Sequence, residues 1–319
     1  MIHFIRLTRP LNLFVIALTM YGLGWYFNDF IATSEITGVY DVDFFLLVFS
    51  TLLIAAAGNI INDYFDVRAD RINKPHQLII DVYVKRRIAI VTHWALNILA
   101  FGIAVFLSWR LETFWYVFIH LLSINLLWYY SSNLKRKFLI GNIIIAGLTA
   151  MVPILVGIYF FQCHQLGNTE DFIYQLYPLT QFEDASFILW FSFALAGFAF
   201  LFNLAREIVK DMEDMDGDKL LRAKTVPIVL GLKKTKLIIG SVLAAAIFAI
   251  PLFSAELQPN SNVTLIPIGC AALLAFISAI LLIRAKEKMS YKLINTCLKL
   301  AMVFGLLSPV FWKLIFVYA

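Results

Sequence analysis

Charged residues are scarce in this sequence of 319 residues. They account for 15% of the chain, whereas a soluble domain of this size carries roughly a quarter. Hydrophobic residues account for 61%, which is more apolar surface than a water-soluble fold of this length can bury. The composition therefore excludes a soluble globular protein and predicts an integral membrane protein.

Cysteine clusters and the common nucleotide-binding and hydrolase motifs are also missing. Cys163, Cys270 and Cys297 are isolated from one another and from histidines, so we predict neither zinc nor an iron–sulfur centre. There is no Walker A loop, no G-x-S-x-G and no H-E-x-x-H. The N-terminal segment lacks a clear cleavage site, so we expect its helix to be retained.

The sequence does contain apolar runs of about twenty residues, the length that a helix needs to cross a bilayer. Lipid allows only helices or closed barrels, and barrel strands would alternate at every second residue. The runs are unbroken, so we predict an all-α polytopic protein forming one domain over residues 1–319. The nine expected helices cover residues 10–31, 44–63, 87–108, 113–130, 138–161, 186–207, 235–254, 263–284 and 292–318.

Positive charge is distributed unevenly between the two sides of these helices. All but three of the 26 lysines and arginines lie at the N-terminus or around the loops after even-numbered helices; the exceptions are Arg110, Lys299 and Lys313. The positive-inside rule then predicts a cytoplasmic N-terminus and a C-terminus on the outside. The formal charge of +5 is explained by this topology and does not indicate nucleic-acid binding.

Two aspartate-rich segments share one spacing. Asp63, Asp66 and Asp70 step by three and four residues, and so do Asp211, Asp214 and Asp218, at a constant offset of 148 residues. The same offset pairs Asn59 with Glu207 and Arg71 with Lys219. Each segment follows an even-numbered helix, so both are expected at the cytoplasmic face. We interpret them as a parallel internal repeat.

Steps of three and four place side chains on one face of a helix, so each segment predicts an aligned row of carboxylates. Such rows repel one another unless a cation lies between them. Magnesium suits the site, because it takes one or two carboxylates and completes its shell with water and phosphates. Basic residues nearby suggest a diphosphate held through Mg²⁺; they are Arg71, Lys74, Lys219, Arg222 and Lys224.

A different class of function stays open at this point, because carboxylates in membrane proteins also mark ion pathways in transporters. Transporter sites usually lie near the bilayer midplane. In this sequence the acidic residues gather at one face, and the helix centres are almost free of charge, with Lys299 as the main exception. Ordinary solvated loops are a further alternative, which the matched spacing disfavours.

The segments "NDYFDVRAD" (62–70) and "DMDGD" (214–218) resemble the two signatures of the UbiA superfamily of intramembrane prenyltransferases. "YSSNLKR" (130–136) and "RLTRPLN" (6–12) are similar to further elements of that family. The resemblance implies nine helices in a ring around a central cavity. Within the superfamily, "REIVKDMEDMDGD" is most similar to the branch that transfers a geranylgeranyl group to geranylgeranylglyceryl phosphate in ether-lipid synthesis.

The resemblance also implies roles for individual residues. It implies that one Mg²⁺ is held by Asp63, Asp66 and Asp70, and a second by Asp214 and Asp218 with help from Asp211. The negative charge of the leaving diphosphate would be neutralised by Lys135, Arg71, Lys74 and Lys224. Substrate contacts would also come from Asn59, Asn62 and Tyr130. The expected partners are a prenyl diphosphate, a lipophilic acceptor and the bilayer.

The acceptor is the substrate that the sequence constrains least. Branches that prenylate aromatic quinone precursors share the same core motifs. Gln77 and Leu78 also stand where many members continue with Arg-Pro. The sequence leaves open the prenyl chain length and the oligomeric state.

Overall fold

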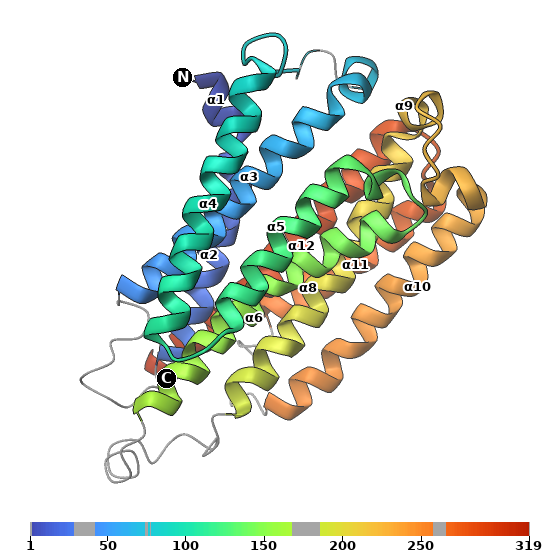
Figure 1. Ribbon diagram of the computed structural model, residues 1–319. Helices are drawn as coiled ribbons and strands as arrows, with labels where there is room; N and C mark the ends of the chain where they lie inside the picture. Colours follow the sequence, from blue (N-terminus) through green and yellow to red (C-terminus); the bar gives the residue numbers. More distant parts are fainter. Residues whose placement is uncertain are drawn as a thin grey trace.

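The computed structural model describes residues 2–28, 42–73, 76, 78–167, 186–257 and 266–318, and these are overwhelmingly helical (Figure 1). Within these ranges the only β structure is an isolated bridge between Ile80 and Val84. The short helices are α1 (Ile2–Leu7), η4 (Leu134–Arg136) and α9 (Met215–Leu220). The described part of the chain also contains nine helices of 18 residues or more: α2 (Pro10–Phe27), α3 (Val42–Asn73), α4 (Arg86–Arg110), α5 (Trp115–Ser132), α6 (Ile140–Gly167), α8 (Ser186–Glu213), α10 (Val226–Leu257), α11 (Ile266–Arg284) and α12 (Lys288–Tyr318). The predicted all-α class is confirmed.

Seven of these helices are long and apolar enough to cross a membrane, counted over the described residues. They are α2, α3, α4, α6, α8, α11 and α12. This finding supports an integral membrane protein, as the composition predicts. The count of nine membrane spans stays a prediction, since α5 and α10 are not among the seven.

The helices that carry the aspartates extend well beyond their predicted ends. The sequence predicted helices over 44–63 and 186–207, whereas α3 continues to Asn73 and α8 to Glu213. Hydropathy locates the end of an apolar run. Backbone hydrogen bonding can continue the helix beyond that point into polar residues. The carboxylates therefore project from ordered helix, which fixes their spacing.

Two other helices start earlier than predicted. The segment predicted over 235–254 begins at Val226, and the helix continues through a sharp kink at Gly231, where φ is 75° and ψ is 164°. Glycine tolerates this positive φ because it has no Cβ. The segment predicted over 292–318 begins at Lys288. For the first predicted helix, α2 ends at Phe27, and residues 29–31 lie outside the described ranges.

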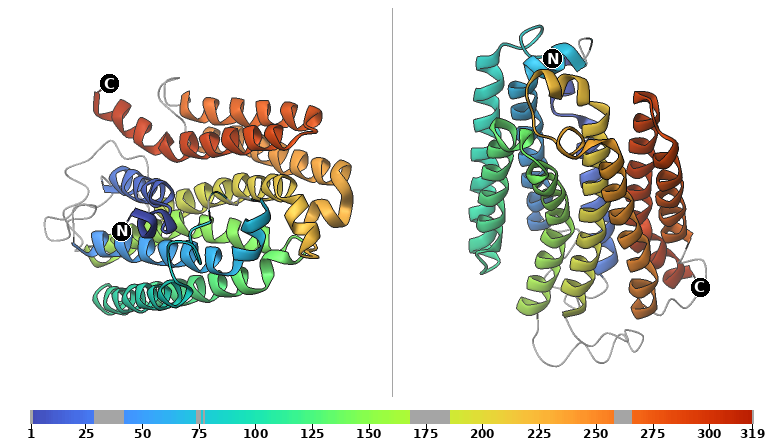
Figure 2. Two further views of the ribbon diagram at one scale, coloured as in Figure 1. Left: turned by 90° about the horizontal axis from the view of Figure 1, so that it is seen from above. Right: turned by 90° about the vertical axis from the view of Figure 1, so that its right-hand side faces the viewer.

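The long helices form a closed circuit of neighbours. α2 packs against α3, α6 and α12; α3 packs against α5; α5 packs against α6; and α8 packs against both α6 and α12. α4 packs against α3 and α5. α10 packs against α8 and α11, and α11 packs against α12. Figure 2 shows this arrangement from above, with α4 on one side and α11 and α12 on the other. α1 and α9 lie at one end of the bundle, here named the motif end, and the C-terminus lies at the opposite end (Figure 1).

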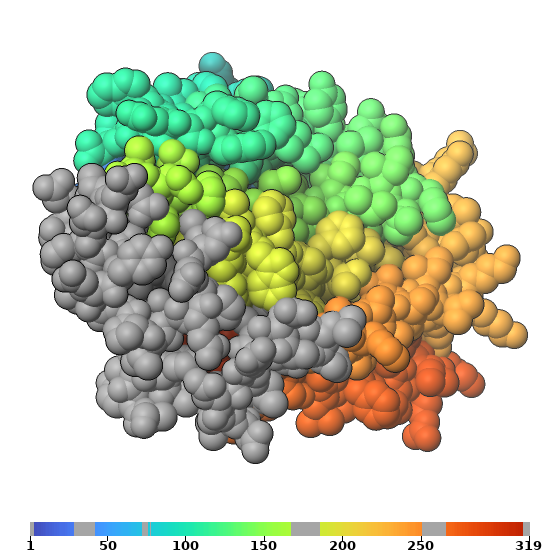
Figure 3. Space-filling model, turned by 90° about the horizontal axis from the view of Figure 1, so that it is seen from below, coloured from blue at the N-terminus to red at the C-terminus, as the bar shows by residue number. Residues whose placement is uncertain are grey.

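Aromatic side chains fill the bundle near the end opposite the motifs. Phe27, at the last turn of α2, packs against Phe160 and Phe191 with ring centroids 5.8 and 5.7 Å apart. Phe44 joins them from the start of α3, at 5.4 Å from Phe160, and Trp312 packs on Phe191 at 5.6 Å. All five are buried. In Figure 3, seen from this end, α4, α8 and α10 follow one another across the face. Buried aromatic side chains thus pack together in the interior near this end.

The close contact between α6 and α8 depends on a glycine, and this gives a prediction. A Cβ at Gly157 would lie 2.5 Å from Ser192 Cβ, whereas a Cβ at Gly147 on the same helix would meet nothing within 4 Å. We expect Gly157→Ala to destabilise the protein by about 1–3 kcal/mol through overpacking. Gly147→Ala, the matched control, should be neutral or stabilising by up to about 1 kcal/mol, because alanine favours helix. Thermal unfolding in detergent measures both, and equal melting temperatures would contradict the close approach.

Candidate functional site

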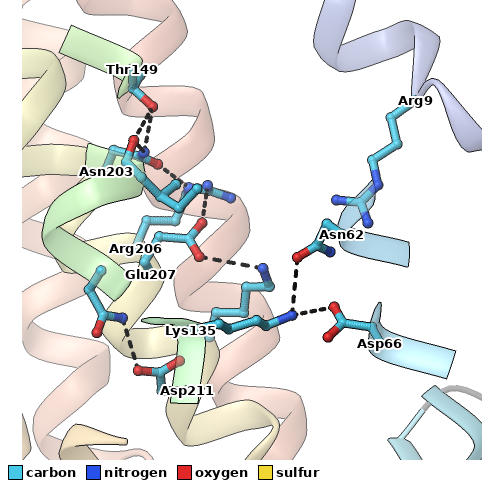
Figure 4. Close-up of polar contacts among 12 residues, drawn as sticks. Arg9, Asn62, Asp66, Lys135, Thr149, Asn203, Arg206, Glu207 and Asp211 are labelled. Carbon is cyan, nitrogen blue, oxygen red and sulfur yellow. Dashed lines mark hydrogen bonds and ion pairs between the residues drawn. The ribbon is translucent and has the colours of Figure 1, made fainter. Parts of the chain in front are cut away.

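The first aspartate motif occupies the polar end of α3. Asp66 is buried, with 7% of its surface exposed, and Asn62 lies one turn earlier on the same side of the helix. Figure 4 shows both side chains pointing into the space between α3 and α8. Asp63 and Asp70 complete the motif on the same continuous helix. The predicted alignment of these groups on α3 follows from helix continuity.

The second motif is built differently, because its helix breaks. α8 ends at Glu213, and Asp214 leaves helical geometry at φ −95° and ψ 7° before α9 begins. α9 packs against α3, which brings the two motifs together at the motif end. Asp218, on α9, lies within electrostatic range of Asp66 and of Lys135. The two carboxylate rows therefore lie close together at the motif end, on elements that pack against each other.

Lys135 links the two motifs. Its ammonium donates to the Asp66 carboxylate and to Asn62 Oδ1, the latter at 3.4 Å. Burial on its own would lower the pKa of Lys135, but the Asp66 carboxylate and its acidic neighbours outweigh burial and hold that pKa above its ordinary value. The side chain is therefore a fixed positive charge in the middle of the acidic residues (Figure 4).

Lys135 is held in place by the backbone around η4. A Cβ at Gly141 would lie 3.0 Å from Lys135 Cα and 3.1 Å from Leu134 O, so glycine permits η4 to pack tightly on the start of α6. On the other side, the Lys224 amide nitrogen donates to Arg136 O at 2.8 Å. The loop after α5 is thus tied to the segment after α9, and Lys135 is positioned by elements from three parts of the chain.

The junction between α1 and α2 rests on the first motif. Arg9, in the left-handed region at φ 54°, forms an ion pair with Asp63 at 2.5 Å between Nη2 and Oδ1. Asn59 Nδ2 donates to the Thr8 carbonyl oxygen at 2.9 Å and so anchors the same junction. Asn59 was predicted to contact substrate, and in the structure its amide positions the backbone next to Arg9. Arg9 was not among the predicted site residues.

The remaining predicted residues divide into two groups. Tyr130 is buried within electrostatic range of Lys135 and Asp66, and Asp211 Oδ2 accepts from Asn142 Nδ2 at 2.9 Å, so both belong to the interior. Arg71 instead lies at the surface, 61% exposed, with Asp81 at 3.8 Å. Lys224 is exposed and contributes its backbone amide to the loop contact above. Lys74 and Gln77 lie outside the described residues.

A network on α8 faces the first motif and was missed in the sequence. Glu207 is buried and pairs with Arg206 and with Lys210, the second at 3.4 Å. Asn203 Oδ1 accepts from Arg206 Nε at 2.8 Å, and Asn203 Nδ2 donates to Thr149 Oγ1 of α6 at 2.6 Å (Figure 4). One signal was present in the sequence, because Glu207 is the repeat partner of Asn59.

The donor set can be tested against the predicted metal. Among the described residues, no three His, Cys, Asp or Glu side chains converge to hold an ion by themselves. Magnesium does not need three, since water and phosphate oxygens complete its octahedron. Burial, together with Asp214 and Asp66, raises the pKa of Asp218 to about 6, against the opposing charge of Lys135. Crowded carboxylates of this kind favour a hard cation, so the residues fit Mg²⁺ bound together with a phosphate ligand.

Comparison with known proteins identifies the family of this chain. A model described as the UbiA prenyltransferase family matches residues 13–303. The chain belongs to the UbiA prenyltransferase family. It is 29% identical to digeranylgeranylglyceryl phosphate synthase of Methanothermobacter thermautotrophicus over 94% of this chain and 92% of that protein. The family expected from the motifs is thereby confirmed.

Solved structures share the fold. A digeranylgeranylglyceryl phosphate synthase structure superposes with a TM-score of 0.64 at 24% identity, covering 97% of this chain and 96% of that one. A UbiA homolog from Archaeoglobus fulgidus, bound to GPP and Mg²⁺, superposes with a TM-score of 0.57 at 15% identity, covering 96% and 99%. The chain therefore has the helical fold of UbiA family members.

The position of Lys135 predicts that its side chain contributes to the rate of prenyl transfer. Lys135→Met should reduce prenyl transfer about 100- to 1,000-fold, because it removes a preorganised charge from the site. Lys137→Met is the matched control, since Lys137 lies exposed in the same loop. Purified variants are compared by product formation and by melting temperature. Wild-type turnover in a folded Lys135→Met protein would show that the charge has no catalytic role.

Proposed function

We propose that this chain transfers a geranylgeranyl group from its diphosphate to geranylgeranylglyceryl phosphate, forming an ether lipid in a Mg²⁺-dependent reaction. The observation that carries the proposal is the meeting of the two aspartate motifs around Lys135. The choice of acceptor is supported by the named synthase, which is similar along nearly the whole chain. The choice of metal is supported by the donor set and by the relative bound to GPP and Mg²⁺.

In this proposal each aspartate motif holds one metal ion. Asp63, Asp66 and Asp70 would hold one Mg²⁺ from α3. The second ion would be held from the other side by Asp214 and Asp218, with Asp211 nearby. When bound, Mg²⁺ neutralises the charge that develops on a leaving diphosphate. Lys135 adds a permanent positive charge at the same place, and Arg9 adds a second through its contact with Asp63.

The reaction follows from these positions. The bond between C1 of the prenyl group and the diphosphate oxygen breaks, and its electron pair leaves with the diphosphate. The acceptor hydroxyl oxygen bonds to C1, and its proton passes to the released diphosphate, a base that the reaction itself supplies. Asn62 orients the Lys135 ammonium, which it contacts at 3.4 Å. The buried ring of Tyr130, within electrostatic range of Lys135 and Asp66, would favour the allylic cation through its π face.

The bundle supports a substrate with a charged head and an apolar tail. The motifs lie at one end, where the diphosphate can enter from water, while buried aromatic side chains pack together near the opposite end. An isoprenoid chain would extend from the motifs towards this apolar part of the bundle. A transporter would instead place its charged site near mid-membrane between broken helices.

An acceptor panel tests the proposal. Membranes containing the protein receive labelled geranylgeranyl diphosphate with geranylgeranylglyceryl phosphate, or with an aromatic quinone precursor. We expect product from the glyceryl phosphate acceptor, loss of product with EDTA and recovery with Mg²⁺. Exclusive prenylation of the aromatic compound would replace the proposed acceptor by the quinone-type alternative. Absence of prenyl transfer with every acceptor would reject the enzyme function.

The orientation in the membrane is a separate proposal, that the motif end faces the cytoplasm. It is supported by the lysines and arginines gathered at that end. His76→Cys and Arg222→Cys place thiols at exposed positions beside each motif. Both should react with an impermeant reagent only after the cytoplasmic side is opened, with the parent chain as the control for Cys163, Cys270 and Cys297. Labelling of both from the outside would invert the topology.

A further inference from the structure

The α8 network holds two cations beside Glu207. Arg206 and Lys210 both pair with Glu207, the first in direct contact and the second at 3.4 Å. Their side chains are 18% and 29% exposed, so solvent screens them only in part. Both cations therefore face Glu207, and Lys210 also lies within electrostatic range of Asp211 on the same helix.

Lys299 adds a third cation from α12. Among the described residues it forms no hydrogen bond or ion pair, and it lies within electrostatic range of Arg206, Lys210 and Glu207. It is also an exposed lysine eleven residues into a helix that qualifies as a membrane span. A charge at such depth is costly, and ionisable residues kept there usually have a function.

An apolar pocket lies further along the two helices that carry these cations. It lies between α8, α10, α11 and α12, and its lining includes Phe198 and Phe202 of α8 and Met302 and Leu306 of α12. Phe202 precedes Arg206 by four residues, and Met302 follows Lys299 by three, so each pair shares a helix face. The one hydroxyl in the lining, on Ser308, already donates to Gly305 O at 2.7 Å. The basic residues thus share their helices with a pocket that offers only apolar contacts.

We propose that Arg206, Lys210 and Lys299 bind the phosphate of the acceptor lipid, and that the pocket further along the same helices receives its isoprenoid tail. This inference rests on the proposed function and specifies the acceptor as a phosphomonoester. The three cations outnumber Glu207 and Asp211, the two α8 carboxylates within electrostatic range of Lys210, and this favours an anionic group such as a phosphomonoester. The donor diphosphate has its own place, since the carboxylates suited to metal ions lie on α3 and α9.

The rigidity of the α8 network agrees with this role. Arg206 is held by Asn203, which is itself fixed to Thr149 of α6 (Figure 4). A guanidinium held in this way loses little freedom when it binds an anion, and its planar fork suits phosphate oxygens. Lys299 is the adaptable member, because the described residues give it no partner that it would have to release.

Lys299→Gln provides the test. The Michaelis constant for geranylgeranylglyceryl phosphate should rise about tenfold or more, because a charge-assisted contact is lost. The Michaelis constant for geranylgeranyl diphosphate should stay within about twofold. Lys292→Gln is the matched control, on the same helix seven residues earlier and also exposed. Binding of labelled acceptor to the purified protein without donor gives a second readout that does not depend on turnover.

A neutral acceptor, geranylgeranylglycerol, completes the design. The wild-type protein should discriminate strongly in favour of the phosphorylated acceptor, and Lys299→Gln should lose about tenfold of that preference. Unchanged preference and unchanged acceptor binding in Lys299→Gln would overturn this inference while leaving the proposed function intact. If the wild-type protein prenylates neither acceptor, the proposed function itself fails.

Discussion

The contact between Lys135 and Asp66 is the interaction on which the organisation of the site depends. Rows of carboxylates at the end of apolar helices repel one another, and burial strengthens this repulsion. Asp66 is 7% exposed, so loss of its partner would leave an uncompensated, nearly buried charge, at a cost of about 3–5 kcal/mol. The surface pair between Arg71 and Asp81, at 3.8 Å, is worth no more than about 1 kcal/mol. Backbone contacts of η4 with the start of α6 and with the segment after α9 hold Lys135 beside Asp66.

Those constraints explain why short elements matter in a bundle of long helices. η4 is three residues long, yet it is fixed by the close approach at Gly141 and by the hydrogen bond from Lys224 N to Arg136 O. α9 is six residues long and exists because α8 breaks at Asp214. The long helices bring the two motifs to one end, and these short elements set the distance between opposite charges across the interior.

Composition and periodicity in the sequence were sufficient to predict the helices and the spacing of the aspartates. Apolar runs predicted the helices, and the steps of three and four predicted the aligned aspartates. The helix ends were misjudged because hydropathy reports the lipid boundary, while α3 continues through the polar motif to Asn73. Arg9 could not be assigned from the sequence, since its contact with Asp63 joins residues 54 positions apart across a left-handed backbone turn. Long-range ion pairs of this kind leave no periodic signal.

The two aspartate segments differ at the position four residues before their first aspartate. Asn59 and Glu207 occupy equivalent places, 148 residues apart. In the first segment the neutral amide of Asn59 donates to the Thr8 carbonyl oxygen. In the second segment the carboxylate gathers Arg206 and Lys210 instead. α3 thus presents aspartates, which suit a metal-bound diphosphate, and α8 presents Arg206 and Lys210, which suit a phosphate. A reaction that joins two anionic lipids needs both, because each headgroup must be neutralised separately before the two can approach.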